Sequence, residues 1–262
     1  MLTLTTLASG SSGNCTLVSD GTTHILVDAG ISARRITTAL KGLGIDPRSL
    51  SGVLVTHEHS DHICGLTTLA KQLSFPVYAS HGTAGALCCR IPTLEARMHA
   101  FTPGVSFEVG GVAVETFATP HDTAQSNGYA LSAGGRKAAV VTDLGCPTEE
   151  VRRGIKGSHL LVAETNHEVE WVQSGPYPYF LKARVLGERG HLSNQAGAEL
   201  ICSAVREGAN TILLAHLSKE NNTPARAYET VSAALERQGA AVGRDVRLEV
   251  APRAEVGQTY VV

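Results

Sequence analysis

The chain has 262 residues, of which 43% are hydrophobic and 18% are charged, and its formal net charge is −2. This length suits one large α/β domain or two half-domains that share a core. The negative charge argues against a broad basic surface for nucleic acid and leaves only a local basic patch open. The six cysteines form no C-x-x-C pair, and a chain of this length does not need disulfide staples.

The N-terminus alternates like a strand and lacks the charged-then-apolar layout of a signal peptide. No apolar run approaches the roughly 18 residues of a membrane span. We therefore expect a cytoplasmic protein with no membrane partner.

Hydrophobic periodicity predicts alternating strands and helices along the whole chain. Strands are expected at residues 2–7, 16–18, 24–27, 53–56, 77–79, 106–109, 112–118, 128–132, 137–141, 160–162, 211–214, 246–250 and 258–261. Helices are expected at 33–43, from Ile63 to about 73, from Thr83, at 196–206 and at 225–238. This order predicts an α/β fold in which two mixed sheets pack face to face with helices outside. No repeat or linker divides residues 1–262, so we expect one domain.

The densest motif is His57-Glu58-His59-Ser60-Asp61-His62, which stands between an expected strand and an expected helix. In such a loop, side chains can converge on one point. Imidazole nitrogen and carboxylate oxygen are the ligands that Zn²⁺, Mn²⁺ and Fe²⁺ take in proteins. The motif therefore predicts a metal site.

Three later polar residues each follow an expected strand: His121, Asp143 and His216. Taken singly, a strand-end Asp is more often a cap and a strand-end His a satisfied polar residue. Their order after the H-x-H-x-D-H run is what makes them candidate ligands.

Together with Asp28, which ends the strand 24–27, these residues make the chain resemble the metallo-β-lactamase superfamily over nearly its whole length. The resemblance implies the four-layer αβ/βα sandwich and a site where the two sheets meet at one edge. It assigns His57, His59 and His121 to a first metal ion, Asp61, His62 and His216 to a second, and Asp143 to a bridge between them. It also implies that Asp28 orients the ligand loop.

That ligand set implies two divalent ions, Zn²⁺ or Mn²⁺, that share a bridging hydroxide for hydrolysis, with Asp61 orienting the nucleophile. Flavodiiron-type relatives carry Glu where His59 stands, and this chain does not. Some mononuclear-iron dioxygenases share the run without using the residue at Asp61, so this alternative stays open.

Less general segments are similar to the bacterial YycJ/WalJ-type hydrolases. They are residues 8–15 (ASGSSGNC), 164–167 (ETNH), 175–178 (GPYP), 181–184 (LKAR) and 190–194 (GHLSN), with Glu168 where Asp is expected. The resemblance implies a metal-dependent phosphodiesterase, in particular a 5′→3′ DNA exonuclease. The interval between Asp143 and His216 is too short for the inserted domain of β-CASP nucleases, so substrate grip must come from residues 164–194, a partner subunit of a homo-oligomer, or both.

Phosphate chemistry suggests which of these residues contact the substrate. The Ser/Gly loop offers donors to an anion, either histidine of the later segments could protonate the leaving oxygen, and a basic strip with aromatic neighbours could hold a strand. The candidates are Ser11, Ser12, Asn14, Asn166, His167, His191, Lys182, Arg184 and Arg189, with Trp171, Tyr177 or Tyr179 as stacking faces. Each group also has a structural explanation. The Ser/Gly loop can be a plain tight turn, the basic strip can be a solvated helix face, and the tyrosines can pack within the segment.

Two small-molecule hydrolases compete with a nuclease: a cyclic-phosphate phosphodiesterase and a thioesterase of the glyoxalase II kind. Glutathione thioesters would need a basic cluster after the last ligand, where only Lys219 and Arg226 stand. A binding module without catalysis is disfavoured because no ligand position is substituted.

Overall fold

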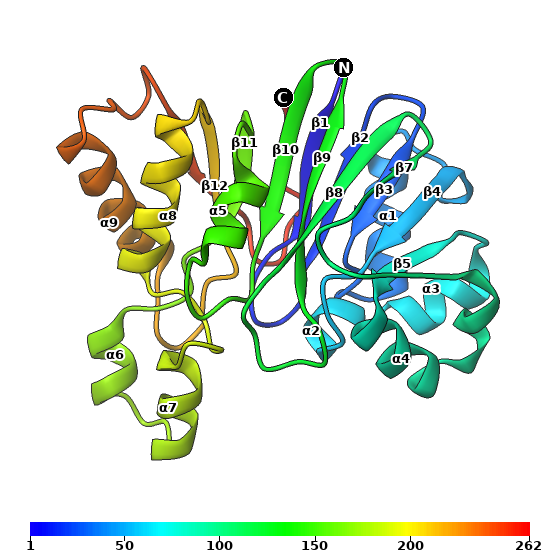
Figure 1. Cartoon of the computed structure of the whole chain (residues 1–262), viewed down its shortest axis with the longest axis horizontal. Coiled ribbons are helices and arrows are strands. Elements are labelled where there is room, and N and C mark those ends of the chain that lie inside the picture. The colour runs from blue at the N-terminus through cyan, green and yellow to red at the C-terminus, as the bar shows by residue number, and fades with distance from the viewer.

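The apolar runs form two seven-stranded sheets that pack face to face, with helices on both outer sides (Figure 1). The structure is a computed structural model that describes residues 1–262. The first sheet has the order β14-β1-β2-β3-β4-β5-β6, and the second has the order β13-β12-β11-β10-β9-β8-β7. This arrangement confirms the predicted pair of mixed sheets with helices outside.

The strands of the first sheet are β1 (Thr3–Ala8), β2 (Cys15–Ser19), β3 (His24–Val27), β4 (Leu50–Leu54), β5 (Val77–Ser80), β6 (Met98–Phe101) and β14 (Thr259–Val261). Those of the second are β7 (Ser106–Val109), β8 (Val112–Ala118), β9 (Asn127–Ala133), β10 (Arg136–Val141), β11 (Leu160–Glu164), β12 (Thr211–Ala215) and β13 (Arg247–Val250). The helices are α1 (Ala33–Gly42), α2 (Ser60–Ile63), α3 (Leu66–Gln72), α4 (His81–Arg90), α5 (Glu149–Ile155), α6 (Val169–Ser174), α7 (Tyr179–Leu186), α8 (Asn194–Arg206) and α9 (Pro224–Arg237).

Side-chain alternation along the strands divides the core into three layers. In β3, Ile25 and Val27 belong to the cluster between the two sheets, whereas Leu26 belongs to the cluster beneath α1, α3 and α4. Successive strand residues point to opposite faces, so a strand buried on both sides serves two clusters at once. A third cluster lies between the second sheet and α5, α8 and α9.

Parallel strands bring the candidate ligands to one edge. The neighbours β3 and β4 are parallel, as are β10, β11 and β12. Their carboxyl ends therefore face the same way in each sheet. The short helix α2, which follows the H-x-H motif, marks this edge in the lower part of Figure 1, and the two chain ends lie at the opposite edge.

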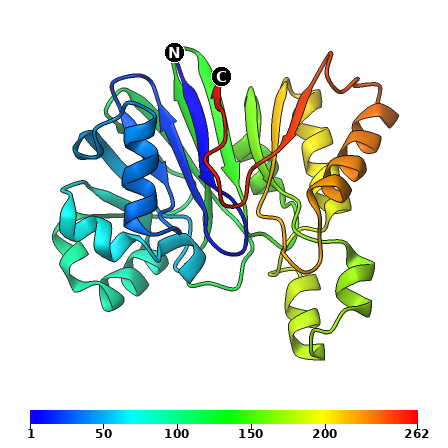
Figure 2. The ribbon, with the colours of Figure 1, turned by 180° about the vertical axis from the view of Figure 1, so that it is seen from behind.

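The structure departs from the sequence-based expectation in one long segment. Residues 164–194, where no strand or helix is expected from the sequence before residue 196, hold α6 and α7, which extend from the body as a pair of short helices (Figure 2). The helix α5 was also not predicted. All six cysteines are free. No helix combines the length and apolar composition that crossing a membrane requires.

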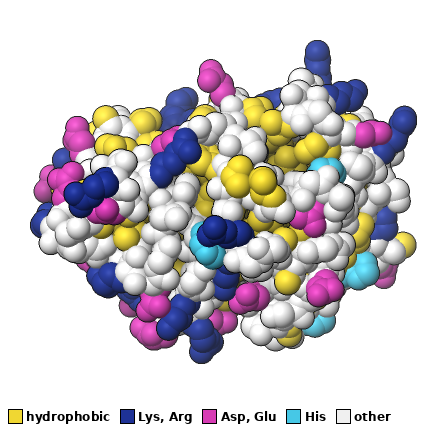
Figure 3. All heavy atoms as spheres, turned by 90° about the horizontal axis from the view of Figure 1, so that it is seen from above, with side chains coloured by type: hydrophobic (Ala, Val, Ile, Leu, Met, Phe, Trp, Pro, Cys, Tyr) yellow, Lys and Arg dark blue, Asp and Glu magenta, His cyan; other side chains and the backbone are white.

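Charges are mixed on the face seen in Figure 3, where Lys and Arg side chains are interspersed with Asp and Glu. No broad basic area gathers on that face. This agrees with the composition and directs attention to the opposite edge.

Candidate metal centre

Three residues of the site follow strands in the left-handed backbone region: Asp28 (φ 63°), Asp143 (φ 59°) and His216 (φ 54°). They are the only non-glycine residues with positive φ in the chain. Such a conformation is unfavourable for a residue with a side chain and persists only where the surroundings fix it. Its concentration at three strand ends indicates that the backbone is bent there to aim side chains at the edge.

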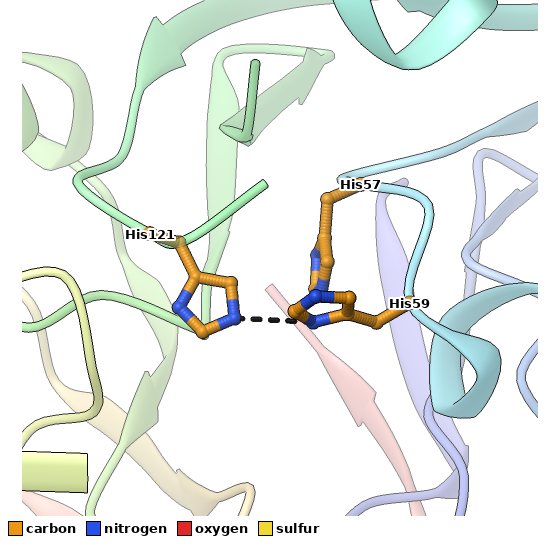
Figure 4. A group of neighbouring side chains, drawn as sticks. All are labelled: His57, His59 and His121. Atoms are coloured by element: carbon orange, nitrogen blue, oxygen red, sulfur yellow. Dashed lines mark hydrogen bonds between the residues drawn. The ribbon is translucent and has the colours of Figure 1, made fainter. Parts of the chain in front are cut away.

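Three imidazoles converge in the first group, which consists of His57, His59 and His121 (Figure 4). One ligand atom of each lies within 4.8 Å of those of the others. His121 Nε2 is 3.3 Å from Nδ1 of His59. His57 and His59 come from the loop between β4 and α2, and His121 comes from the loop after β8.

The second group consists of Asp61, His62 and His216. Asp61 Oδ2 lies 3.5 Å from His62 Nε2 and 3.4 Å from His216 Nε2. Asp143 lies between the two groups: its Oδ2 is 3.2 Å from His62 Nε2, and its Oδ1 is 3.8 Å from His121 Nε2. The structure therefore brings all seven candidate ligands together, and the two triads that the resemblance implies are among the groups close enough to hold an ion.

Outer partners orient four of the imidazoles through Nδ1. His62 Nδ1 contacts Asp28 at 2.7 Å, His121 Nδ1 contacts Gly190 O at 3.0 Å, and His57 Nδ1 contacts the Thr56 hydroxyl at 3.0 Å. Nδ1 of the fourth, that of His216, contacts a buried carboxylate at 2.9 Å. With Nδ1 engaged outward, Nε2 of each ring is left for the centre, as in metal sites whose histidines are held by a second layer of hydrogen bonds.

Asp28 also fixes the loop that carries the motif. Its Oδ1 accepts hydrogen bonds from the backbone N–H of Thr56 at 2.8 Å and from the Thr56 hydroxyl at 3.1 Å. Asp28 thus lies where the sequence-based expectation puts an orienting residue.

The carboxylate behind His216 is Glu164, to which sequence analysis gave no role. Glu164 is fully buried at the end of β11, and its Oε1 accepts hydrogen bonds from His191 Nδ1 at 2.8 Å and from His216 Nδ1 at 2.9 Å. The backbone N–H groups of Leu144 and Leu192 donate to Oε2. The sequence contains a signal for this residue, because Glu164 stands at the end of an apolar strand as the other candidate site residues do.

The buried imidazoles and carboxylates of the cluster shift one another's pKa values. Burial, and then the neighbouring His62, lower the pKa of His57 well below its usual range, so this ring stays neutral. Burial opposes charge on His216, but Asp143 and Asp61 outweigh it and raise its pKa to about 10. Burial likewise opposes charge on Asp143, yet His216 and His62 hold its pKa well below its usual range.

Two buried atoms test whether a metal ion fits. His57 Nε2 is buried and has no hydrogen-bond partner, and the buried Oδ2 of Asp143 faces only the imidazole of His62. Buried polar atoms are nearly always paired, so an imidazole nitrogen without a partner beside a buried carboxylate is the donor arrangement that a cation would satisfy. Carboxylate, and imidazole that has released its proton, are donors that Zn²⁺ and Mn²⁺ both accept, and the residues therefore fit divalent ions.

A pocket of about 380 Å³ opens over the cluster. Of its 18 lining residues only three are hydrophobic, which suits a charged substrate. Among the expected substrate residues, the pocket lining contains Ser11, Asn166, Tyr177, Arg184 and His191. Arg184 also forms an ion pair with Asp122.

The structure does not bring His167 to the pocket, which corrects the expectation that it contacts phosphate. His167 is 1% exposed, it is not among the lining residues, and burial lowers its pKa to about 4. Its carbonyl accepts a hydrogen bond from the backbone of Asn194. His167 therefore helps to pack the start of α8.

Asn14, Ser12 and Lys182 are also absent from the pocket lining. Asn14 is buried, and its amide donates to Gly10 O and contacts His62 Nε2, so it supports the Ser/Gly loop and lies against the cluster, outside the pocket lining. Ser12 is exposed on the turn. Lys182 donates to Gln173 O on the neighbouring helix.

Arg189 does not extend the basic strip either. Its guanidinium donates to the backbone carbonyl of His121 through two nitrogens, at 3.0 and 2.7 Å. This arginine holds a ligand loop and is not free for a substrate.

Comparisons with known proteins agree with this geometry. A family model described as a beta-lactamase superfamily domain matches residues 23–217. The chain is 39% identical to exodeoxyribonuclease YycJ of Bacillus anthracis, over 90% of each chain. It is 33% identical to exodeoxyribonuclease WalJ of Streptococcus pneumoniae serotype 2, over 92% of this chain and 91% of the relative. The metallo-β-lactamase fold protein YhfI of Bacillus subtilis shares the fold with a TM-score of 0.74 over the whole of both chains, at 16% identity.

Proposed function

We propose that this chain, which belongs to the metallo-β-lactamase superfamily and is a metal-dependent hydrolase, is a 5′→3′ DNA exonuclease with a two-metal centre. The observation that carries the proposal is the seven-residue cluster at the floor of a polar pocket. The names of the two bacterial relatives supply the substrate class.

His57, His59 and His121 would hold one ion, Asp61, His62 and His216 the other, and Asp143 would contact both. Divalent ions held there supply a water of lowered pKa and neutralise charge on a phosphodiester. Of the carboxylates Asp61 and Asp143, Asp61 is the more exposed, since its side chain is 23% exposed and that of Asp143 is 2% exposed. It is therefore the carboxylate able to orient an attacking water from the pocket side.

His191 would protonate the leaving oxygen. Its side chain is 21% exposed in the pocket, and Glu164 engages its Nδ1. The other ring nitrogen, Nε2, remains to give a proton to an oxygen of the substrate. The lining residues Ser11, Asn166 and Arg184 offer hydroxyl, amide and guanidinium donors to the phosphate.

Hydrolysis of defined duplexes tests the proposal. Chelator-treated protein is re-supplied with Mn²⁺ or Zn²⁺ and given 5′-phosphorylated and 5′-hydroxyl DNA, and products are resolved on a sequencing gel. We expect mononucleotides to be released progressively from the 5′ end, and this release to be lost in Asp61→Ala. His81→Ala, which removes an exposed histidine at the start of α4, is the matched control and should retain the activity.

Two results would contradict the proposal. Release from the 3′ end would reverse the polarity. Intact DNA beside rapid cleavage of bis-p-nitrophenyl phosphate would move the substrate to a small phosphodiester while retaining the metal centre.

A further inference from the structure

The helices α6 and α7 form an arm, residues 169–186, that extends past the sheets in both ribbon views (Figures 1 and 2). The two helices pack against each other. α7 has the sequence YFLKARVL, yet none of its side chains is buried. Six of its eight residues are hydrophobic, and none of them belongs to the core.

Two adjacent rings at the start of α7 are the most exposed aromatic side chains in the protein. Tyr179 is 86% exposed and Phe180 is 72% exposed. Isolated surface hydrophobics are common, but neighbouring aromatic rings left in solvent usually mark a binding surface. Trp171 of α6 is 40% exposed and adds a third ring to the arm.

One side of the arm has a hollow of about 490 Å³, lined in part by Tyr179, Lys182 and Leu186. The Lys182 ammonium donates one hydrogen bond to Gln173 O and has two donors left. An aromatic ring beside an ammonium group matches a nucleotide, whose base stacks on the ring while its phosphate meets the cation.

The other side of the same helix lines the catalytic pocket, through Leu181, Arg184 and Val185. An α-helix with its side chains is about 10–12 Å across, so the hollow and the catalytic pocket are separated only by the width of α7. A continuous strand can occupy both. The arm itself, residues 169–186, carries two basic side chains and one acidic side chain, a net charge of +1 in a chain whose total is −2, and this favours a polyanion as its partner.

We propose that Tyr179 and Phe180 bind single-stranded DNA adjacent to the nucleotide being hydrolysed, by stacking on its bases. The proposal rests on the proposed function, since it assigns the arm to the same substrate. It explains why the arm keeps aromatic residues that packing does not use.

The test is binding of a fluorescent single-stranded DNA of about 20 nucleotides, followed by anisotropy with the full-length protein and no added metal, so that no hydrolysis is needed. Tyr179→Ala and Phe180→Ala should each raise Kd about fivefold or more, the lower end of what one stacked base contributes. Tyr179→Phe keeps the ring and should retain the affinity. Tyr228→Ala, which removes a ring that is 37% exposed on α9, should also leave Kd unchanged. Melting temperature shows that each variant is folded.

An unchanged Kd in both alanine variants would overturn the proposal. So would a dimer, seen by sedimentation, that Phe180→Ala dissociates without changing Kd for DNA, because the surface would then belong to a second copy. Failure of the proposed function is separate: tight DNA binding through the rings without any DNA hydrolysis in Mn²⁺ or Zn²⁺ would retain the stacking surface and remove the exonuclease.

Discussion

Glu164 Oε1 lies 2.8 Å from His191 Nδ1, and the same oxygen lies 2.9 Å from Nδ1 of His216. One buried carboxylate therefore orients both the proposed proton donor and a residue of the proposed metal centre. Burial opposes its charge, but His191 outweighs that effect and lowers the pKa of Glu164 to about 2. The carboxylate is thus ionised throughout the working range of pH.

Replacing this charge by an amide should affect both functions at once. In Glu164→Gln the shape is kept, but one oxygen becomes an N–H donor that cannot accept from an imidazole. We expect metal affinity to fall about 10–100-fold, as for other outer partners of metal-binding histidines, and hydrolysis to fall at least as much. Chelator competition and initial rates measure the two. Glu229→Gln, on the exposed face of α9, is the control, and equal behaviour of both variants would contradict the assignment.

Asp28→Asn separates orientation from folding. Asn tolerates the left-handed backbone that residue 28 adopts and can still accept from the Thr56 backbone, so the fold should remain. The neutral amide no longer holds His62 by charge, and metal affinity should fall about 10–100-fold. Isothermal titration of metal-free protein with Zn²⁺ measures this change. Asp46→Asn replaces a cap by an equally good one and should bind metal as the wild type does.

Gly30 is required by a close approach of two chain segments. A Cβ at this position would lie 1.7 Å from the carbonyl oxygen of Asp61. Gly30→Ala should push the motif loop away, destabilise the protein by about 3 kcal/mol or more, and lower metal affinity. Urea unfolding of metal-free protein measures the stability. Gly42→Ala meets open space in α1 and should instead stabilise by about 0.5–1 kcal/mol; a loss there as large as at Gly30 would contradict this explanation.

The last strand should lose stability at alkaline pH. Tyr260 donates to Glu249 at 2.7 Å, and burial, followed by this carboxylate, raises the pKa of Tyr260 to about 12 from 10.0. Because the folded state keeps the proton longer than the unfolded state, this contribution is complete below pH 10 and is lost as the pH rises to about 12. Between these values the melting temperature should fall more steeply in the wild type than in Tyr260→Phe. Parallel curves for the two proteins would show that Tyr260 does not carry the effect.

Sequence patterns predict the sheets well because a buried strand either alternates hydrophobic and polar residues or is hydrophobic throughout. Both patterns occur among these strands. The seven candidate ligands can be recognised because they follow expected strands in the order of the family's motif. Their assignment to two ions comes from the resemblance and stays a prediction. The same patterns could not find α6 and α7, since α7 buries nothing and so lacks the apolar stripe by which a helix is recognised.

Roles that depend on the direction in which a side chain points are harder to predict from sequence than the position of a residue along the chain. His167 and His191 are both histidines in segments typical of the same subfamily, yet one is 1% exposed behind the pocket and the other has a side chain that is 21% exposed within it. Asn14 likewise looks like a phosphate donor in sequence, but it is turned inward to His62. Only the packed structure decides which way such side chains point.

The pairing of β1 with β14 has a consequence for synthesis. β1 is made first and contacts β2 on one side, but its other neighbour, Thr259–Val261, is made more than 250 residues later. While the chain emerges from the ribosome, the outer edge of β1 offers unpaired N–H and C=O groups to any other nascent strand. Aggregation during expression should therefore begin at this edge, and rapid translation or early capture of the first sheet should improve the yield of folded protein.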